Sequence, residues 1–160
     1  FSVPDNPGST YTWFVPAGAS ITSDPKLHEI EVTFNMALTG QVSCIETSNS
    51  VCTTVHFPAE VTVHPLPLAY NLTAQSYYCS GSSGVTVTLS NSQTGVNYQL
   101  YRNGIAEGPV VSGTGSSLTW PGMEEGVYHV NAVLAVHPFC EITMNGNPVV
   151  EEVPPIVITL

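Results

Sequence analysis

Gly40-Gln41-Val42-Ser43-Cys44 and Gly126-Val127-Tyr128-His129-Val130 begin two similar segments of the sequence. In each segment a glycine opens an alternating run, a connection containing a cysteine follows, and a β-branched run closes the segment. Alternation with a period of two indicates a strand that buries one face and exposes the other. The repetition predicts β-sandwich modules in tandem.

The rest of the sequence also favours strands over helices. Thirteen glycines and thirteen prolines divide it into short runs rich in Val, Ile, Thr and Tyr. Asn103-Gly104 and Asn145-Gly146 predict tight turns between such runs. The predicted strands cover residues 11–15, 29–35, 40–46, 55–64, 85–90, 97–102, 105–111, 116–120, 126–135, 140–144 and 155–160. We therefore expect an all-β protein built from two tandem β-sandwich domains.

A proline-rich connector, His64-Pro65-Leu66-Pro67-Leu68, separates the two parts. Proline fixes φ and disfavours helix in the residue before it, so the connector is expected to be short and extended. This predicts domains at residues 1–66 and 67–160. The first domain is short, and its first strand is expected upstream of Phe1, which would leave one sheet edge unpaired.

Strand parity predicts which aromatic side chains are buried. Trp13 is expected to anchor the core of the first domain, with Tyr11 on the same side. In the second domain, Tyr98 and Trp120 are expected in the core. Tyr101 has the opposite parity from Tyr98 and is expected at the surface.

The chain is acidic, and this excludes several classes of partner. Its net charge is −10, and its only basic residues are Lys26 and Arg102. Nucleic acid and anionic membrane surfaces both require a basic footprint, so neither is an expected partner. No apolar run is long enough for membrane insertion. Only 9% of residues are charged, which is typical of extracellular β-rich proteins.

Four cysteines in such a chain favour an oxidising compartment. Cys79 opens the second domain and Cys140 follows its long penultimate strand, so a Cys79–Cys140 disulfide is expected. Cys44 and Cys52 have a spacing suited to a bridge across a hairpin. The alternative pairs Cys52 with an upstream cysteine and leaves Cys44 buried and free. Zinc is disfavoured because there is no Cys-x-x-Cys pair.

Paired acids at Glu124-Glu125 and Glu151-Glu152 are candidates for chemistry. Carboxylate pairs hydrolyse glycosides only within a cleft, so solvated turns are the preferred interpretation. Calcium binding through Asp5, Asp24, Glu124 and Glu125 is an alternative, although no Asp-x-Asp-x-Asp loop is present. Otherwise no cofactor and no metal ligands are expected.

Catalytic residues are not predicted. The histidines at positions 28, 56, 64, 129 and 137 are scattered and expected to be solvated, and no Gly-x-Ser-x-Gly elbow occurs. We therefore expect a protein that is not an enzyme. Tyr101 and Tyr77 are the candidate ligand-binding residues, because exposed aromatic rings can stack against sugar rings.

The sequence opens with Phe1-Ser2-Val3-Pro4-Asp5-Asn6-Pro7-Gly8-Ser9-Thr10-Tyr11-Thr12-Trp13, followed by Val15-Pro16-Ala17-Gly18-Ala19-Ser20-Ile21. This stretch resembles the PKD-like repeats of secreted Bacteroidota surface proteins. The second part contains Tyr78-Cys79-Ser80-Gly81, then Gly84-Val85-Thr86-Val87, then Gln93-Thr94-Gly95-Val96-Asn97-Tyr98-Gln99-Leu100-Tyr101-Arg102-Asn103-Gly104. These segments resemble the Ig-like repeats that accompany the PKD-like ones.

Such repeats occur in very large adhesins, including gliding-motility adhesins exported by the type IX secretion system. The resemblance implies a PKD-like first domain, an Ig-like second domain and a location on the exterior of the bacterial outer membrane. It implies a non-catalytic role in spacing or adhesion. The implied partners are neighbouring repeats of the same chain and extracellular polysaccharide or other surfaces. Cys44 departs from the aliphatic residue usual in this family.

Two other functions are compatible with the sequence. One is an accessory carbohydrate-binding module of a secreted polysaccharide-degrading enzyme, which predicts exposed aromatic side chains. The other is a subunit of a secreted filament that is completed by strand donation. The filament hypothesis predicts a strand-shaped groove beside Phe34 and Val42.

Overall fold

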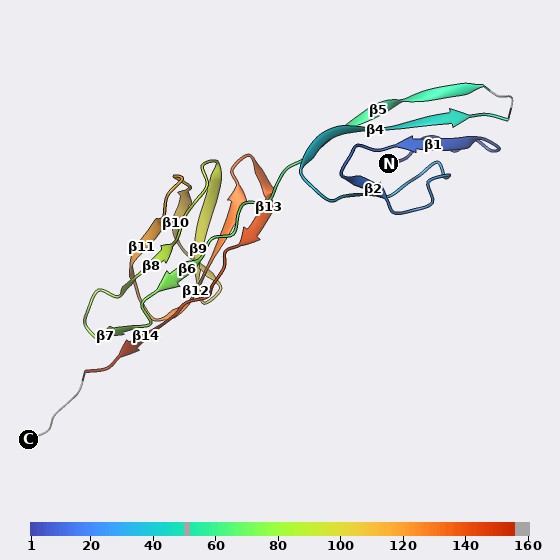
Figure 1. Ribbon diagram of the computed structural model, residues 1–160. Coiled ribbons are helices and arrows are strands. Elements are labelled where there is room, and N and C mark those ends of the chain that lie inside the picture. The colour runs from blue at the N-terminus through green and yellow to red at the C-terminus, as the bar shows by residue number, and fades with distance from the viewer. Residues whose placement is uncertain (50–51, 156–160) are drawn as a thin grey trace, which may run out of the picture. The chain divides into compact units, whose positions relative to one another are not determined.

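The computed structural model describes residues 1–49 and 52–155 (Figure 1). Within these residues it contains strands and no helix, so the prediction of an all-β protein is confirmed. The strands are β1 (Thr10–Phe14), β2 (Ala19–Ile21), β3 (Val32–Phe34), β4 (Leu38–Thr47), β5 (Thr53–Val63), β6 (Leu72–Ala74), β7 (Tyr77–Cys79), β8 (Val85–Leu89), β9 (Val96–Arg102), β10 (Ile105–Ser112), β11 (Leu118–Met123), β12 (Gly126–Leu134), β13 (His137–Thr143) and β14 (Val149–Val153).

The chain divides into two compact units. Unit 1 is Phe1–Pro65 and unit 2 is Leu66–Leu160. The division lies one residue before the boundary expected from the sequence, within the proline-rich connector. Each unit has its own sheets, because every strand pairing joins two strands of the same unit.

Unit 1 contains a three-stranded sheet, β1-β4-β5, and a two-stranded sheet, β2-β3. Its buried apolar residues are Tyr11, Ile30, Val42 and Cys44. The expected anchor, Trp13, is only half-buried, and its ring N–H donates to the carbonyl oxygen of Leu27 at 2.9 Å. Tyr11 anchors this core instead, because its hydroxyl bonds the backbone of the opening loop while its ring is covered.

The outer edge of β5 is interrupted by a bulge. The register with β4 shifts between Val42 and Cys44, and Pro58 lies in the bulged segment of β5. A bulge and a proline both weaken an edge as a template for another strand. The groove expected beside Phe34 and Val42 is also filled at both residues. Val42 is buried, and the ring of Phe1 packs edge-on against Phe34.

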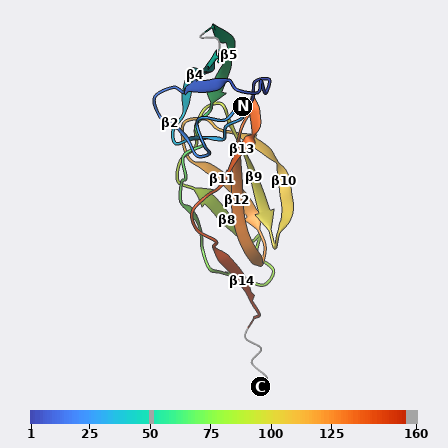
Figure 2. The same cartoon turned by 90° about the vertical axis from the view of Figure 1, so that its right-hand side faces the viewer.

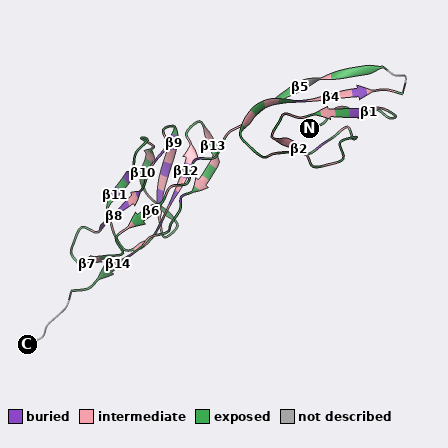
Figure 3. Cartoon of the chain, viewed as in Figure 1, coloured by how far each residue is buried: buried purple, intermediate pink, exposed green. Residues whose placement is uncertain are grey.

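Unit 2 is a sandwich of two sheets. The larger sheet has the order β10-β9-β12-β14-β7, with β13 also paired to β12, and the smaller sheet is β11-β8-β6. Buried residues from both sheets form one shared core. Figure 3 shows the buried positions along the strands. The core includes Tyr98 and Trp120, as the strand parity predicted.

The hairpin between β9 and β10 has the predicted two-residue turn. Asn103 has φ of 51° and Gly104 has φ of 80°. Two successive positive φ values are the backbone of a type I′ turn, whose twist matches that of paired strands.

Several strands were not predicted. The three-residue strands β2, β6 and β7 and the five-residue strand β14 are absent from the sequence prediction. β13 begins at His137 rather than at residue 140. The strand predicted for 155–160 lies almost entirely outside the described residues.

The chain passes through unit 2 from one end to the other. Near its start, Leu68 donates its N–H to the side chain of Gln93, close to the end of β12. At the other end, β14 pairs with the beginning of β12, at Gly126 and Val127, and with β7. Figures 1 and 2 show β13 and β14 at opposite ends of this unit.

Candidate functional site

The outer face of the larger sheet of unit 2 carries side chains in rows that cross its strands. From the end where the chain enters, the rows are Asn97, Val133 and Glu141; then Gln99, Asn131 and Thr143; then Tyr101 and His129. Intervening residues such as Tyr98 and Leu100 point into the core and are fully buried. The alternation of β9 and β12 therefore places amides, a carboxylate and two aromatic rings on one surface.

Tyr101 and His129 form a stacked pair on this face. Their ring centroids lie 4.8 Å apart, and the ring planes are 3° from parallel. They are directly opposite one another on β9 and β12, and both are half-buried. The stack fixes the orientation of the tyrosine ring before any ligand arrives.

Gln99 shapes the surface beside this stack. Its side-chain nitrogen donates to the carbonyl oxygens of Leu100 at 2.8 Å, and of Glu107 and Gly108 at 3.2 Å each. The register of β10 against β9 shifts between Glu107 and Val111. The bonds to Glu107 and Gly108 therefore tie Gln99 to the irregular segment of β10.

A hollow of about 280 Å³ lies on this face. Gln99, Tyr101, Val110, Asn131 and Glu141 line it, together with Asn97 and Val133. Its lining is formed by three neighbouring strands and by the irregular segment of β10.

The polar side chains of the hollow are held by one another. The amide nitrogen of Asn131 donates to Glu141 at 2.6 Å, and the hydroxyl of Thr143 donates to the Asn131 amide oxygen at 2.9 Å. The hydroxyl of Ser112 donates to the amide oxygen of Asn97 at 3.1 Å. The Asn97 amide nitrogen and the second carboxylate oxygen of Glu141 have no partner within the described residues, so both are available to a ligand.

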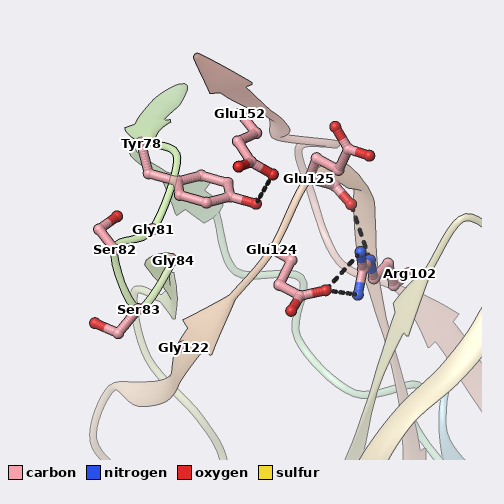
Figure 4. Close-up of a pocket in the computed structure, with 10 residues that line it drawn as sticks. All are labelled: Tyr78, Gly81, Ser82, Ser83, Gly84, Arg102, Gly122, Glu124, Glu125 and Glu152. Carbon is pink, nitrogen blue, oxygen red and sulfur yellow. Dashed lines mark hydrogen bonds and ion pairs between the residues drawn. The ribbon is translucent and has the colours of Figure 1, made fainter. Parts of the chain in front are cut away.

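A second hollow, of about 380 Å³, lies at the end of unit 2 where the chain leaves (Figure 4). Arg102 donates to one carboxylate oxygen of Glu124 through two nitrogens at 3.2 Å each, and to the backbone oxygen of Glu125 at 2.9 Å. Tyr78 donates to Glu152 at 3.2 Å, and burial raises the pKa of this phenol. These groups already bond one another, so they hold β7, β9 and β14 at this end of the unit.

The four candidate calcium ligands are divided between the two units. Asp5 and Asp24 belong to unit 1, whereas Glu124 and Glu125 belong to unit 2. Among the residues with assigned positions, no three His, Cys, Asp or Glu side chains are placed to hold a metal ion. Glu124 instead pairs with Arg102.

The two tyrosines predicted to bind ligand occupy separate places. Tyr101 lies on β9 and lines the hollow, and Tyr77 is 58% exposed on the edge strand β7. Two strands, β12 and β14, lie between them in the sheet. Tyr77 is therefore not part of the same surface site.

Neither predicted disulfide is present, and the four cysteines carry free thiols. Cys79 on β7 lies opposite Val153 of β14 in the strand register, at a level beyond the first residue of β12. Cys140 lies on β13, which is hydrogen-bonded to the other end of β12. A strand rises about 3.3 Å per residue, so roughly 20 Å or more separates these two cysteines. A disulfide requires Cα atoms about 4.4–6.8 Å apart. The sequence did not reveal that β14 and β13 flank opposite ends of β12, so the expected Cys79–Cys140 pairing has no support in this structure.

The hairpin pair is separated along its own strands. Cys44 on β4 lies opposite His56 on β5. Cys52 lies four residues before His56, so it is roughly 13 Å further along the hairpin than the position opposite Cys44. Cys44 is 1% exposed, and burial raises the pKa of its thiol. The burial of Cys44 agrees with the alternative in which this thiol is free; the pairing of Cys52 with an upstream cysteine stays a prediction.

A buried carboxylate in unit 1 was not singled out from the sequence. Glu46 is 7% exposed, accepts a hydrogen bond from Asn6 at 2.9 Å and lies 3.0 Å from the ring nitrogen of His56. Hydrogen bonds from Ser9, Asn6 and His56 lower the pKa of this carboxyl. The sequence did offer a signal for this site. Glu46 follows Val42 and Cys44 at every second position of β4, so strand alternation places its side chain on the buried face.

The surface residues around Tyr101 were also missed. His129, Gln99 and Asn131 share the outward parity of their strands, and the Asn103-Gly104 turn fixed the pairing of β9 with β10. The pairing of β9 with β12 was not evident, because the two strands are separated by β10 and β11 in sequence.

No family model matches this chain, and no curated protein matches it. Among the residues that the structure describes, no helix is long and apolar enough to cross a membrane.

Proposed function

We propose that this chain is a non-catalytic segment of a large secreted protein of the bacterial cell surface. Its two units are PKD-like and Ig-like sandwich repeats that act as spacers within an adhesin and hold adhesive surfaces away from the cell. The partners of each unit are the neighbouring repeats of the same chain.

The passage of the chain through unit 2 carries this proposal. The connector enters beside Gln93, and β14 leaves beyond the opposite end of β12. Because entry and exit lie at opposite ends, units joined in series add their lengths to the array. An acidic surface with few lysines also keeps a long extracellular chain soluble.

Completion by strand donation has less support as a function. The outer edge of β5 carries a bulge with Pro58, and both Phe34 and Val42 are covered from within unit 1. We therefore propose the spacer in preference to the filament subunit.

Single-molecule force spectroscopy tests the spacer role. The 160-residue chain is stretched between flanking reference domains. We expect two separate unfolding events, with contour-length gains in the proportion of 65 to 95 residues, at roughly 3.5 Å per residue. Extension without a force peak from unit 2, or one event that releases both units together, would overturn the proposal.

A further inference from the structure

We propose that the outer face of unit 2 around Tyr101 binds a neutral polysaccharide. The site is the hollow between the Tyr101–His129 stack and the side chains of Gln99, Asn131 and Glu141. This activity goes beyond the spacer role and does not depend on it, because a unit that resists force poorly can still bind a glycan.

The aromatic pair supplies an apolar contact of fixed orientation. Sugar rings present faces of C–H groups, and these pack against aromatic rings whose polar edges stay hydrated. Tyr101 is held by its stack with His129 at 4.8 Å, so little side-chain entropy is lost when a ligand binds.

The polar groups beside the stack match the hydroxyls of a sugar. Asn97 offers its amide nitrogen as a donor, and Glu141 offers its second carboxylate oxygen as an acceptor. Neither of these two atoms has a hydrogen-bond partner within the described residues. Each sugar hydroxyl both donates and accepts, so adjacent donors and acceptors can bind neighbouring hydroxyls. Hydrogen bonds to Thr143 and Glu141 fix the amide of Asn131 between them.

The charge of the unit favours a neutral glycan over an anionic one. Arg102 is the only Lys or Arg in residues 66–160, and it is paired with Glu124 on the opposite side of β9 from Tyr101. With Arg102 engaged by Glu124, no other lysine or arginine in residues 66–160 can neutralise a uronate or a sulfate. Glu141 adds a negative charge at the hollow itself.

The hollow of Figure 4 is the weaker candidate for a ligand site. Glu124 and Glu152 already have partners in Arg102 and Tyr78, and these bonds hold the strands of that end together. A ligand there would have to displace them.

NMR titration of the ¹⁵N-labelled 160-residue chain tests the proposal. The probes are soluble fragments of laminarin, xyloglucan and galactomannan, with alginate fragments as the anionic comparison. We expect at least one neutral probe to shift the side-chain amide signals of Asn97, Gln99 and Asn131, and alginate to shift none of them.

Two tyrosine variants form a matched pair. Tyr101→Ala is expected to weaken binding of the neutral probe about tenfold, which corresponds to the loss of one aromatic contact. Tyr77→Ala removes an exposed tyrosine elsewhere on the same sheet and is expected to leave the affinity unchanged. Glu141→Ala, on the exposed strand β13, is a second variant that weakens binding without removing core contacts.

The proposal is overturned if no neutral probe shifts these amides, or if alginate binds as well as the neutral probes. It is also overturned if Tyr77→Ala weakens binding as much as Tyr101→Ala does. Dispersed spectra of each variant without ligand establish that the fold is intact.

Discussion

Glu46 shows how a single residue links the stability of unit 1 to pH. Its carboxylate lies in the interior beside Tyr11 and Cys44, where it accepts hydrogen bonds from Asn6, Ser9 and His56. These bonds favour the ionised form, so the pKa of Glu46 in the folded unit lies below its value in the unfolded chain.

The sign of the pH effect follows from this lowered pKa. Below the unfolded pKa, the unfolded state binds more protons than the folded state, so stability falls as the pH falls. Between about pH 5 and pH 3, the melting temperature of unit 1 should drop in the wild-type protein. It should drop less in Glu46→Gln, which has no carboxylate to titrate.

Thermal unfolding followed through the NMR signals of unit 1 measures both proteins. Glu31→Gln, which alters an exposed carboxylate of the same unit, is the control and should keep the wild-type slope. An equally steep acid decline in Glu46→Gln would show that Glu46 does not carry the effect.

At the scale of an element, β9 and β10 depend on two glycines for different reasons. Gly104 has φ of 80° and open space where a Cβ would be placed. Gly113, which follows β10, has no positive φ, but its Cβ would lie 1.9 Å from the carbonyl oxygen of Gln93. One glycine is required by backbone conformation and the other by close packing.

Alanine at each position separates these two causes. Gly104→Ala should cost about 1 kcal/mol, the penalty for a left-handed residue with a Cβ. Gly113→Ala should cost more, about 2–3 kcal/mol, because the backbone must shift to relieve overpacking. Urea denaturation of unit 2 measures both, and equal costs would contradict the distinction.

The elements predicted from the sequence are those whose pattern is local. β8, β9 and β12 alternate clearly, and Asn103-Gly104 indicated its own turn. β2, β6 and β7 have only three residues each, and their pairing partners define them more than their own sequence does. Short strands of this kind carry too few residues to show a period.

Only part of the candidate site could be predicted, because only part of it follows from a local pattern. The exposure of Tyr101 follows from the parity of one strand, so the sequence was sufficient to find it. His129 and Asn131 join it only through the register between β9 and β12. The expected Cys79–Cys140 pairing lacks support for the same reason, because strand order within a sheet depends on distant pairings.

For the whole molecule, the two units differ in how much apolar surface they bury. Unit 2 has a core of fourteen buried apolar residues drawn from both of its sheets. Unit 1 buries Tyr11, Ile30, Val42 and Cys44, and places the carboxylate of Glu46 beside them. Because the stability of a small domain scales with the apolar area it buries, unit 2 should be the more stable of the two.

Separate fragments test this difference. Residues 66–160 should fold alone and unfold in one cooperative urea transition. Residues 1–65 should unfold at a lower urea concentration, with the full chain as the reference for both transitions. A midpoint for residues 1–65 equal to or above that of residues 66–160 would contradict the expectation.

The path of the chain through unit 2 also sets how the unit carries tension. β7 and β14 are parallel neighbours, with Glu151 opposite Tyr77 and Val153 opposite Cys79. Tension from the connector passes through β6, which pairs with β8, before it reaches β7. Tension reaches β14 from its C-terminal end, so β7 and β14 are pulled in opposite directions along their length. Their inter-strand hydrogen bonds run across that direction and are loaded in shear, all at once. Under such loading the bonds must break together, whereas strands peeled from one end would lose them one at a time.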